Sequence, residues 1–153
     1  FFHTDCMIIT LMKIMYTLQS SKISKKIKQS KHMKNMEVLL VEDNQSITKM
    51  LSKFLELEGI KCSTSNSGQN GLEMIQNHEW DNVLLDLTMP EFSGYDVLQA
   101  LRQDGKIKSK NIIILTATEI TNDEIKDWKN EGVKEVIRKP ISDLDYLIKI
   151  LNQ

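Results

Sequence analysis

Residues 82–90 read Asn-Val-Leu-Leu-Asp-Leu-Thr-Met-Pro, a short apolar run that ends on a carboxylate and is followed by a proline-marked loop. The unbroken hydrophobicity of Val83–Leu85 is typical of a parallel strand that is covered on both faces. Asp86 is therefore expected where this strand leaves the sheet. Because burial alone does not stabilise a carboxylate, a side chain at such a position is hydrated, paired with a cationic group or bound to a metal ion.

Three other apolar runs also end on polar side chains. Val38–Val41 leads into Glu42 and Asp43, Ile112–Leu115 leads into Thr116, and Val136-Ile137 leads into Arg138, Lys139 and Pro140. In open α/β sheets, ligands bind at the carboxyl ends of the strands, near the point where the strand order reverses. The strand ends of this chain would bring together three acids, one hydroxyl and one lysine, which predicts a functional site there.

From residue 37 onward, apolar runs alternate with segments of helical periodicity. The expected strands are Glu37–Glu42, Ile60–Ser65, the run that ends at Asp86, Asn111–Thr116 and the run that ends at Lys139. The expected helices are Gln45–Glu58, Gly68–His78, Tyr95–Asp104, Asn122–Glu131 and Asp143–Asn152. The fourth helix has the weakest apolar stripe, with Ile125 and Trp128 as its large apolar residues. Five βα units with short connections predict an α/β fold with a parallel sheet and right-handed crossovers.

The composition is that of an ordinary globular domain, with 41% hydrophobic and 27% charged residues in 153. Two cysteines, Cys6 and Cys62, have no metal-binding spacing, and free thiols are typical of a reducing cytoplasm. Residues 36–153 carry 13 basic and 20 acidic side chains. An acidic domain of this kind argues against nucleic-acid binding.

Residues 1–35 differ from the rest and carry seven lysines against one aspartate. The stretch Met7–Leu18 is apolar on nearly every helical face, and residues 20–34 consist mainly of serine and lysine. The apolar stretch is too short and too interrupted to span a membrane, and its charges follow it, unlike those of a secretory signal. We expect an appendage outside a domain of residues 36–153. The alternative is a weak membrane contact through lysines that meet anionic lipid.

The predicted site has a chemistry that suits phosphoryl transfer. Three carboxylates repel one another unless a cation joins them, and Mg²⁺ prefers such oxygen ligands. Asp86 could then act as a nucleophile toward phosphorus. Lys139 would share the charge of the transferred phosphoryl group, and Thr116 would hydrogen-bond one of its oxygens.

These motifs resemble those of response-regulator receiver domains, the chemotaxis-type phosphoacceptor modules of two-component signalling systems. The resemblance covers residues 36–153 and implies a flavodoxin-like (βα)5 fold, a doubly wound parallel sheet with strand order 2-1-3-4-5. The residues that carry it are Val41-Glu42-Asp43-Asn44, Leu85-Asp86-Leu87-Thr88-Met89-Pro90 with Gly94, Leu115-Thr116-Ala117, and Lys139-Pro140.

The resemblance implies a role for each acidic residue of the site. Asp86 would be the phosphoacceptor. Asp43, Asp86 and the backbone carbonyl of Thr88 would bind Mg²⁺ directly, and Glu42 would bind it through a water molecule.

The resemblance also implies how the domain would receive and pass on a signal. Thr116 would be the switch hydroxyl, Lys139 the partner of the phosphoryl group, and Lys139–Pro140 a cis peptide bond. A histidine kinase or a phosphotransfer protein would donate the phosphate, and the downstream partner would be an unidentified protein. Such a domain is not an enzyme for other substrates, because it catalyses only its own phosphorylation and dephosphorylation.

One position departs from the family pattern, since Val136 stands three residues before Lys139, where Tyr or Phe is usual. The missing aromatic leaves room for a second hypothesis, a receiver-like protein-interaction module that works without phosphorylation. Either Asn44 or Asp43 could be the N-cap of the first helix. Taken singly, Lys139 could be a solvated charge and Thr116 a loop cap. The combination favours the phosphoacceptor. A phosphatase or hydrolase would need longer loops or a cap insertion.

Overall fold

The computed structural model describes residues 35–153. The appendage that the sequence predicts for residues 1–35, and the membrane contact that was its alternative, therefore lie almost wholly outside the described residues. Among the helices of residues 35–153, none is long and apolar enough to cross a membrane.

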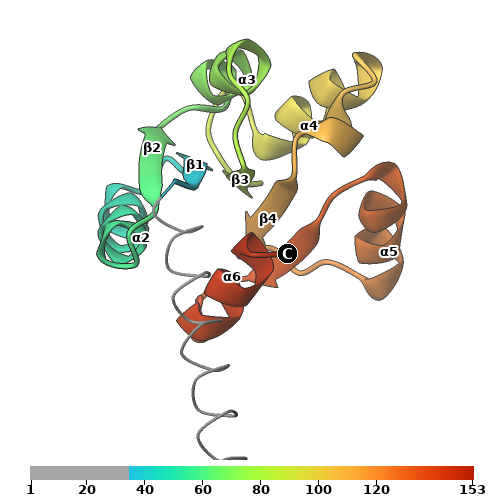
Figure 1. Ribbon diagram of the computed structural model, residues 1–153. Helices are drawn as coiled ribbons and strands as arrows, with labels where there is room; N and C mark the ends of the chain where they lie inside the picture. The colour runs from blue at the N-terminus through green and yellow to red at the C-terminus, as the bar shows by residue number, and fades with distance from the viewer. Residues whose placement is uncertain (1–34) are drawn as a thin grey trace, which may run out of the picture.

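A parallel sheet of five strands forms the centre of the described part of the chain, in the order β2-β1-β3-β4-β5 (Figure 1). This order confirms the flavodoxin-like prediction, and the point of reversal lies between β1 and β3. The strands are β1 (Glu37–Val41), β2 (Lys61–Ser65), β3 (Asn82–Asp86), β4 (Ile112–Thr116) and β5 (Glu135–Arg138).

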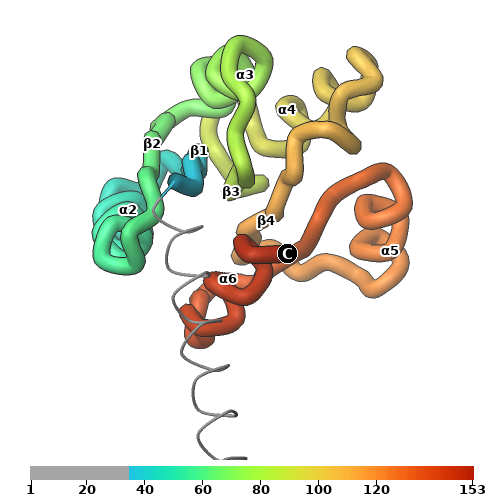
Figure 2. The backbone as a smooth tube through the Cα atoms, viewed as in Figure 1, coloured from blue at the N-terminus to red at the C-terminus, as the bar shows by residue number. Residues whose placement is uncertain are grey.

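Helices cover both faces of the sheet, and the chain can be followed from each strand to the next helix in Figure 2. On one face lie α2 (Gln45–Leu57) and α6 (Leu144–Leu151), and on the other lie α3 (Gly68–Asn77), α4 (Gly94–Gln103) and α5 (Asn122–Glu131). A short 3-10 helix, η1 (Ile107–Ser109), precedes β4. The sequence prediction did not include η1.

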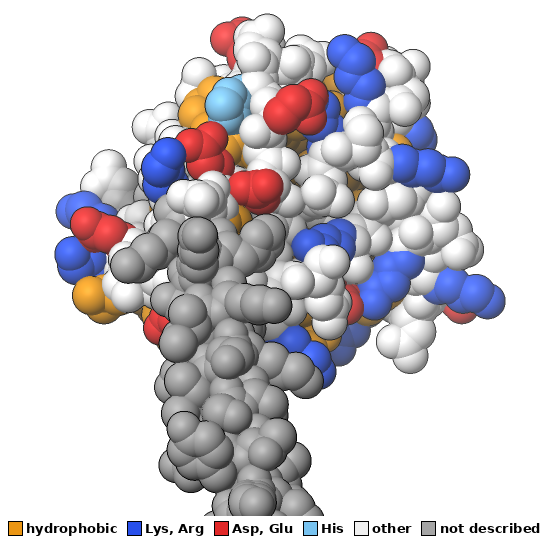
Figure 3. All heavy atoms as spheres, in the orientation of Figure 1, with side chains coloured by type: hydrophobic (Ala, Val, Ile, Leu, Met, Phe, Trp, Pro, Cys, Tyr) orange, Lys and Arg blue, Asp and Glu red, His pale blue; other side chains and the backbone are white. Residues whose placement is uncertain are grey.

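The core consists of two hydrophobic clusters, one on each side of the sheet. Because side chains alternate along a strand, Leu85 joins the cluster under α3, α4 and α5, and Leu84 joins the cluster under α2 and α6. Both faces of β3 are thus buried, which explains why its sequence is apolar without a break. The face drawn in Figure 3 is largely covered by polar side chains, with charges of both signs.

Capping residues explain where the helices begin and end. The Asn44 side chain accepts hydrogen bonds from the backbone N–H groups of Ser46 and Ile47, so Asn44 is the N-cap of α2. The sequence had left Asn44 and Asp43 open for this role. At the end of α5, Gly132 adopts a left-handed conformation with φ of 115°, which is typical of a glycine that stops a helix.

Candidate functional site

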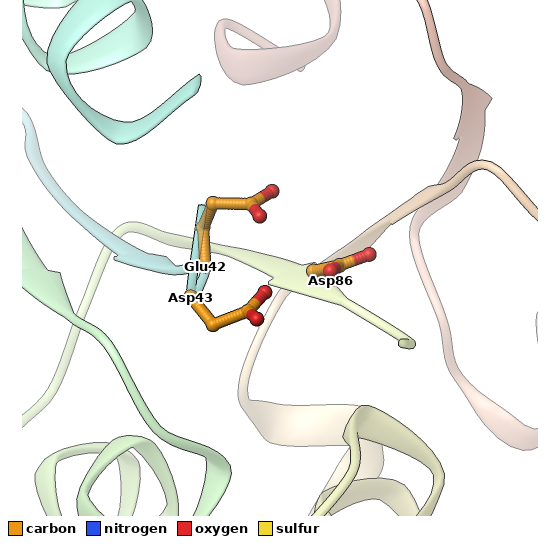
Figure 4. Close-up of side chains that lie close together, drawn as sticks. All are labelled: Glu42, Asp43 and Asp86. Carbon is orange, nitrogen blue, oxygen red and sulfur yellow. The ribbon is translucent and has the colours of Figure 1, made fainter. Parts of the chain in front are cut away.

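The strand register brings the predicted acidic residues together at one edge of the sheet. Val41, the last residue of β1, is paired with Leu85 of β3, so Glu42 and Asp43 leave β1 beside Asp86. Figure 4 shows the three carboxylates in a common space beyond the strand ends. One carboxylate oxygen from each residue lies within 4.8 Å of the others, a spacing that suits a single metal ion.

Lys139 supplies positive charge to this cluster. Its Nζ lies 2.5 Å from Glu42 Oε2 and 3.0 Å from Asp86 Oδ1, and its side chain is 12% exposed. Lys139 follows β5, two strands away from Asp86, and the Lys139–Pro140 peptide bond is cis. The backbone N–H of Lys139 donates to the carbonyl of Thr116 at 2.7 Å, which fixes its position relative to β4.

Burial makes the Glu42 carboxyl harder to ionise. Its side chain is 1% exposed, and this desolvation raises the pKa of the carboxyl above its ordinary value, against the opposing hydrogen bonds from Lys139 and from the backbone of Asn44. The negative charge of Asp86 raises the pKa of Glu42 further. Three acids therefore face one lysine, and an additional cation would be stabilised among them.

The oxygen atoms of the cluster differ in whether they already accept hydrogen bonds from the protein. Both carboxylate oxygens of Glu42 accept hydrogen bonds, from the Asn44 N–H at 3.1 Å and from Lys139. Within residues 35–153, neither the Asp43 carboxylate nor the carbonyl of Thr88 accepts a hydrogen bond from the protein. Because Asn44 caps α2, Asp43 is left available. Asp43, Asp86 and the Thr88 carbonyl thus fit a hard cation as direct ligands, and Glu42 fits an outer position.

The loops on either side of the site are linked through threonines. Thr116 is fully buried at the end of β4, and its Oγ1 accepts the backbone N–H of Thr118 at 3.0 Å. The Thr118 hydroxyl lies 3.1 Å from that of Thr88, which connects the loop after β4 with the loop after β3. Thr116 and Thr88 were predicted from the sequence and Thr118 was not, because nothing in its local sequence sets Thr118 apart from an ordinary loop residue.

Glycine allows α4 to begin directly against Asp86. A Cβ on Gly94 would lie 2.1 Å from the carbonyl oxygen of Asp86 and 2.7 Å from Leu87 Cα. The preceding Ser93 forms a capping box with Asp96, and the hydrogen bonds from Ser93 lower the pKa of the Asp96 carboxyl. The end of β3 and the start of α4 therefore form one rigid corner around the phosphoacceptor candidate.

The structure brings Glu42, Asp43, Asp86 and Lys139 into one cluster and sets Thr116 on the adjoining strand end. It also reveals a contact that the sequence analysis missed, in which Arg138 Nη2 donates to the carbonyl of Ile120 at 2.9 Å. Arg138 was recognised only as part of a polar strand end. Its reach across the loop after β4 depends on the tertiary structure.

Comparisons with known proteins agree with this geometry. The family model of the response regulator receiver domain matches residues 38–152. The polar-differentiation response regulator DivK of Brucella ovis is 31% identical over 105 residues, which cover 69% of this chain and 85% of DivK.

Solved receiver structures have the same fold. The chemotaxis protein CheY4 of Vibrio cholerae superimposes with a TM-score of 0.65 at 28% identity, covering 76% of this chain and 95% of CheY4. The response regulator TrrA of Thermotoga maritima, solved in complex with Mg²⁺ and BeF, superimposes with a TM-score of 0.63 at 28% identity, covering 76% of this chain and 98% of TrrA. With its five parallel strands and the matched segment of residues 38–152, the chain belongs to the receiver domain family of two-component response regulators.

Proposed function

We propose that this domain accepts a phosphoryl group on Asp86 from a phosphohistidine of a histidine kinase or phosphotransfer protein and signals through protein contacts. The observation that carries the proposal is the setting of Asp86. Its side chain is 4% exposed, its Oδ1 is paired with Lys139, and Glu42 and Asp43 lie beside it. A carboxylate held beside a cationic group and metal-binding oxygens is suited to nucleophilic attack on phosphorus.

Mg²⁺ would be held by Asp43, Asp86 and the Thr88 carbonyl directly, and by Glu42 through a water molecule. A bound Mg²⁺ supplies positive charge for the phosphoryl oxygens and neutralises the acid cluster. The fit follows from the unused oxygens of Asp43 and Thr88 and from the two hydrogen bonds that already occupy Glu42.

The residues of the chain would then act as follows. An oxygen of Asp86 forms a bond to phosphorus as the phosphorus–nitrogen bond of the donor histidine breaks, and the histidine keeps the electron pair. Lys139, already 3.0 Å from Asp86 Oδ1, pairs with a phosphoryl oxygen. The hydroxyl of Thr116 donates a hydrogen bond to a second phosphoryl oxygen. Attack of water on phosphorus then breaks the bond to the Asp86 oxygen, releases inorganic phosphate and restores the carboxylate, so the domain would catalyse only its own phosphorylation and dephosphorylation.

Mass spectrometry after incubation with acetyl phosphate and Mg²⁺ tests this function. We expect the mass of one phosphoryl group on the peptide that contains Asp86, and no gain in the Asp86→Asn variant or in EDTA. Stoichiometric phosphorylation of Asp86→Asn would contradict the choice of nucleophile.

A second candidate is a receiver-like interaction module that works without phosphorylation. Two observations favour it, since Val136 replaces the usual aromatic and Lys139 already bridges Glu42 and Asp86. A protein that stays unmodified by acetyl phosphate and also fails to bind beryllofluoride with Mg²⁺ would support this second function. The partly buried free thiol of Cys62 suits either function in the reducing cytoplasm, where we propose that the protein acts.

A further inference from the structure

The loop between β4 and α5 is attached to the edge strand β5 by Arg138. Arg138 is paired with Thr116 in the β4–β5 register, and its Nη2 donates to the carbonyl oxygen of Ile120 at 2.9 Å. Ile120 is buried and immediately precedes Thr121, the N-cap of α5. The guanidinium therefore holds the point at which the loop turns into α5.

This attachment holds a carbonyl of the loop backbone, whereas the backbone N–H of Thr118 is held by Thr116 Oγ1. Within residues 35–153, no other group donates a hydrogen bond to a backbone carbonyl of residues 117–120. An open pocket of about 410 Å³ is lined by residues 116–120, Arg138 and Lys139. The loop is thus bound at Ile120 and has free space beside it.

The position of Val136 explains why Arg138 is the residue that can make this contact. Side chains two residues apart point to the same face of a strand, so Val136 and Arg138 both face the α5 side of β5. Val136 packs against the core cluster on that side and has no polar atom. Arg138 is long and charged and reaches the Ile120 carbonyl above it.

Movement of Thr116 would act on this contact. Thr116 Oγ1 accepts the N–H of Thr118, so a shift of the hydroxyl toward a phosphoryl group on Asp86 pulls on the loop that Arg138 holds. We propose that Arg138 is a positioning residue whose hydrogen bond to Ile120 keeps the loop and the start of α5 in the resting position and is released when Asp86 is phosphorylated. This inference rests on the proposed function of Asp86.

Loss of the hydrogen bond from Arg138 should raise the affinity of the site for beryllofluoride with Mg²⁺. A bond that exists only in the resting state opposes the phosphorylated state, so its removal favours the ligand-bound state by the free energy of the bond. A single hydrogen bond of this kind corresponds to about a two- to tenfold change in an equilibrium constant. The Arg138→Met variant should therefore bind beryllofluoride with Mg²⁺ about two- to tenfold more tightly than the wild type.

Two further variants separate this role from a general loss of structure. Arg138→Lys keeps a charged donor and should return the affinity toward that of the wild type. Arg102→Met removes the ion pair of Arg102 with Glu131 at the other end of α5 and should leave the affinity unchanged. Titrations that follow the Gly94 amide by NMR report binding at the site whether or not the loop moves.

The wild type provides a measurement that does not depend on any variant. On binding beryllofluoride, the carbonyl carbon of Ile120 and the amide of Thr121 should shift as the hydrogen bond from Arg138 is lost. A wild type that binds beryllofluoride with an unmoved Ile120 carbonyl, or an Arg138→Met variant that binds equally or more weakly, overturns the role of Arg138. A wild type that does not bind beryllofluoride at all overturns the proposed function instead.

Discussion

Gly94 is the residue at which the phosphoacceptor and the helix after it are in closest contact. A Cβ there would lie 2.1 Å from the Asp86 carbonyl oxygen and 2.7 Å from Leu87 Cα. Both of these neighbours are backbone atoms, which no side-chain rotation can move away. We expect Gly94→Ala to lower the free energy of unfolding by about 2–3 kcal/mol. Because the clash is at Asp86 itself, the variant should also phosphorylate more slowly. Chemical denaturation and acetyl phosphate labelling check the two effects.

Gly105 provides the matched control. It has a positive φ of 66°, and nothing lies within 4 Å of an added Cβ. Gly105→Ala should therefore cost only the strain of the left-handed backbone, about 1 kcal/mol, without slowing phosphorylation. Equal losses of stability in the two variants would contradict the close-contact explanation for Gly94.

Cys62 is a thiol that the fold keeps protonated. Burial raises its pKa from 9.0 to about 11. At pH 8 the folded protein should hold about a hundredfold fewer thiolates than the unfolded chain, so iodoacetamide should react about a hundredfold more slowly with the folded protein. The Cys6→Ser background isolates this thiol. A rate that rises around pH 9 in the native protein, as in urea, would show that the thiol is not shielded.

The same shift affects stability at high pH. Because the folded pKa is raised, Cys62 stabilises the fold fully below pH 9, and this contribution is lost as the pH rises through about 11. Cys62→Ala should remove that part of the alkaline loss of stability.

Among the α-helices of residues 35–153, α5 buries the fewest residues. Trp128 is its only buried residue, whereas α6 buries Leu147, Ile150 and Leu151. A segment with so little buried apolar surface opens locally at low free energy. Amide hydrogen exchange in the middle of α5 should therefore be at least about tenfold faster than in α6. Equal protection in the two helices would show that α5 opens only with the whole domain and is poorly suited to transmit a local signal.

The sequence pattern was sufficient to predict every strand and every α-helix of residues 35–153 to within one or two residues, because the central strands β1, β3 and β4 are apolar on both faces and the helices carry apolar stripes. The pattern could not predict η1, since a segment of three residues is too short to show a helical periodicity of apolar residues. The choice between Asp43 and Asn44 as helix cap could not be made either, because both side chains can accept the same hydrogen bonds.

The sequence predicted which residues meet at the candidate site, but it did not predict the contacts among them. Strand ends meet at one edge of any parallel sheet, so the pattern alone gathered Asp43, Asp86 and Lys139. The bridge from Lys139 to both Glu42 and Asp86, and the reach of Arg138 to Ile120, depend on loop geometry that no local sequence encodes.

In the whole molecule, the two ends of β3 serve opposite purposes. Asn82 at its start is buried, donates to the Leu151 carbonyl at 3.1 Å and accepts from Lys134 Nζ at 2.7 Å, so it ties β3 to α6 and β5. Asp86 at its other end lies in a cluster with more acids than cations. The hydrogen bonds of Asn82 thus stabilise the fold at one end of β3. At the other end, the repulsion among the carboxylates destabilises the fold unless a cation binds there.

This division predicts how Mg²⁺ changes stability. Asp43→Asn removes one of three neighbouring carboxylates, so in EDTA it should raise the free energy of unfolding by on the order of 1 kcal/mol. Saturating Mg²⁺ should stabilise the wild type, by about 2.7 kcal/mol at a hundred times Kd, and the variant much less.

Asn82→Ala is the control, since it leaves Lys134 and the Leu151 carbonyl without this partner and should destabilise by about 2 kcal/mol with and without Mg²⁺. Thermal and urea unfolding of the three proteins measure these differences. If Asp43→Asn is no more stable than the wild type in EDTA, the repulsion among the acids is already relieved by Lys139, and the cluster does not need a cation for its charge balance.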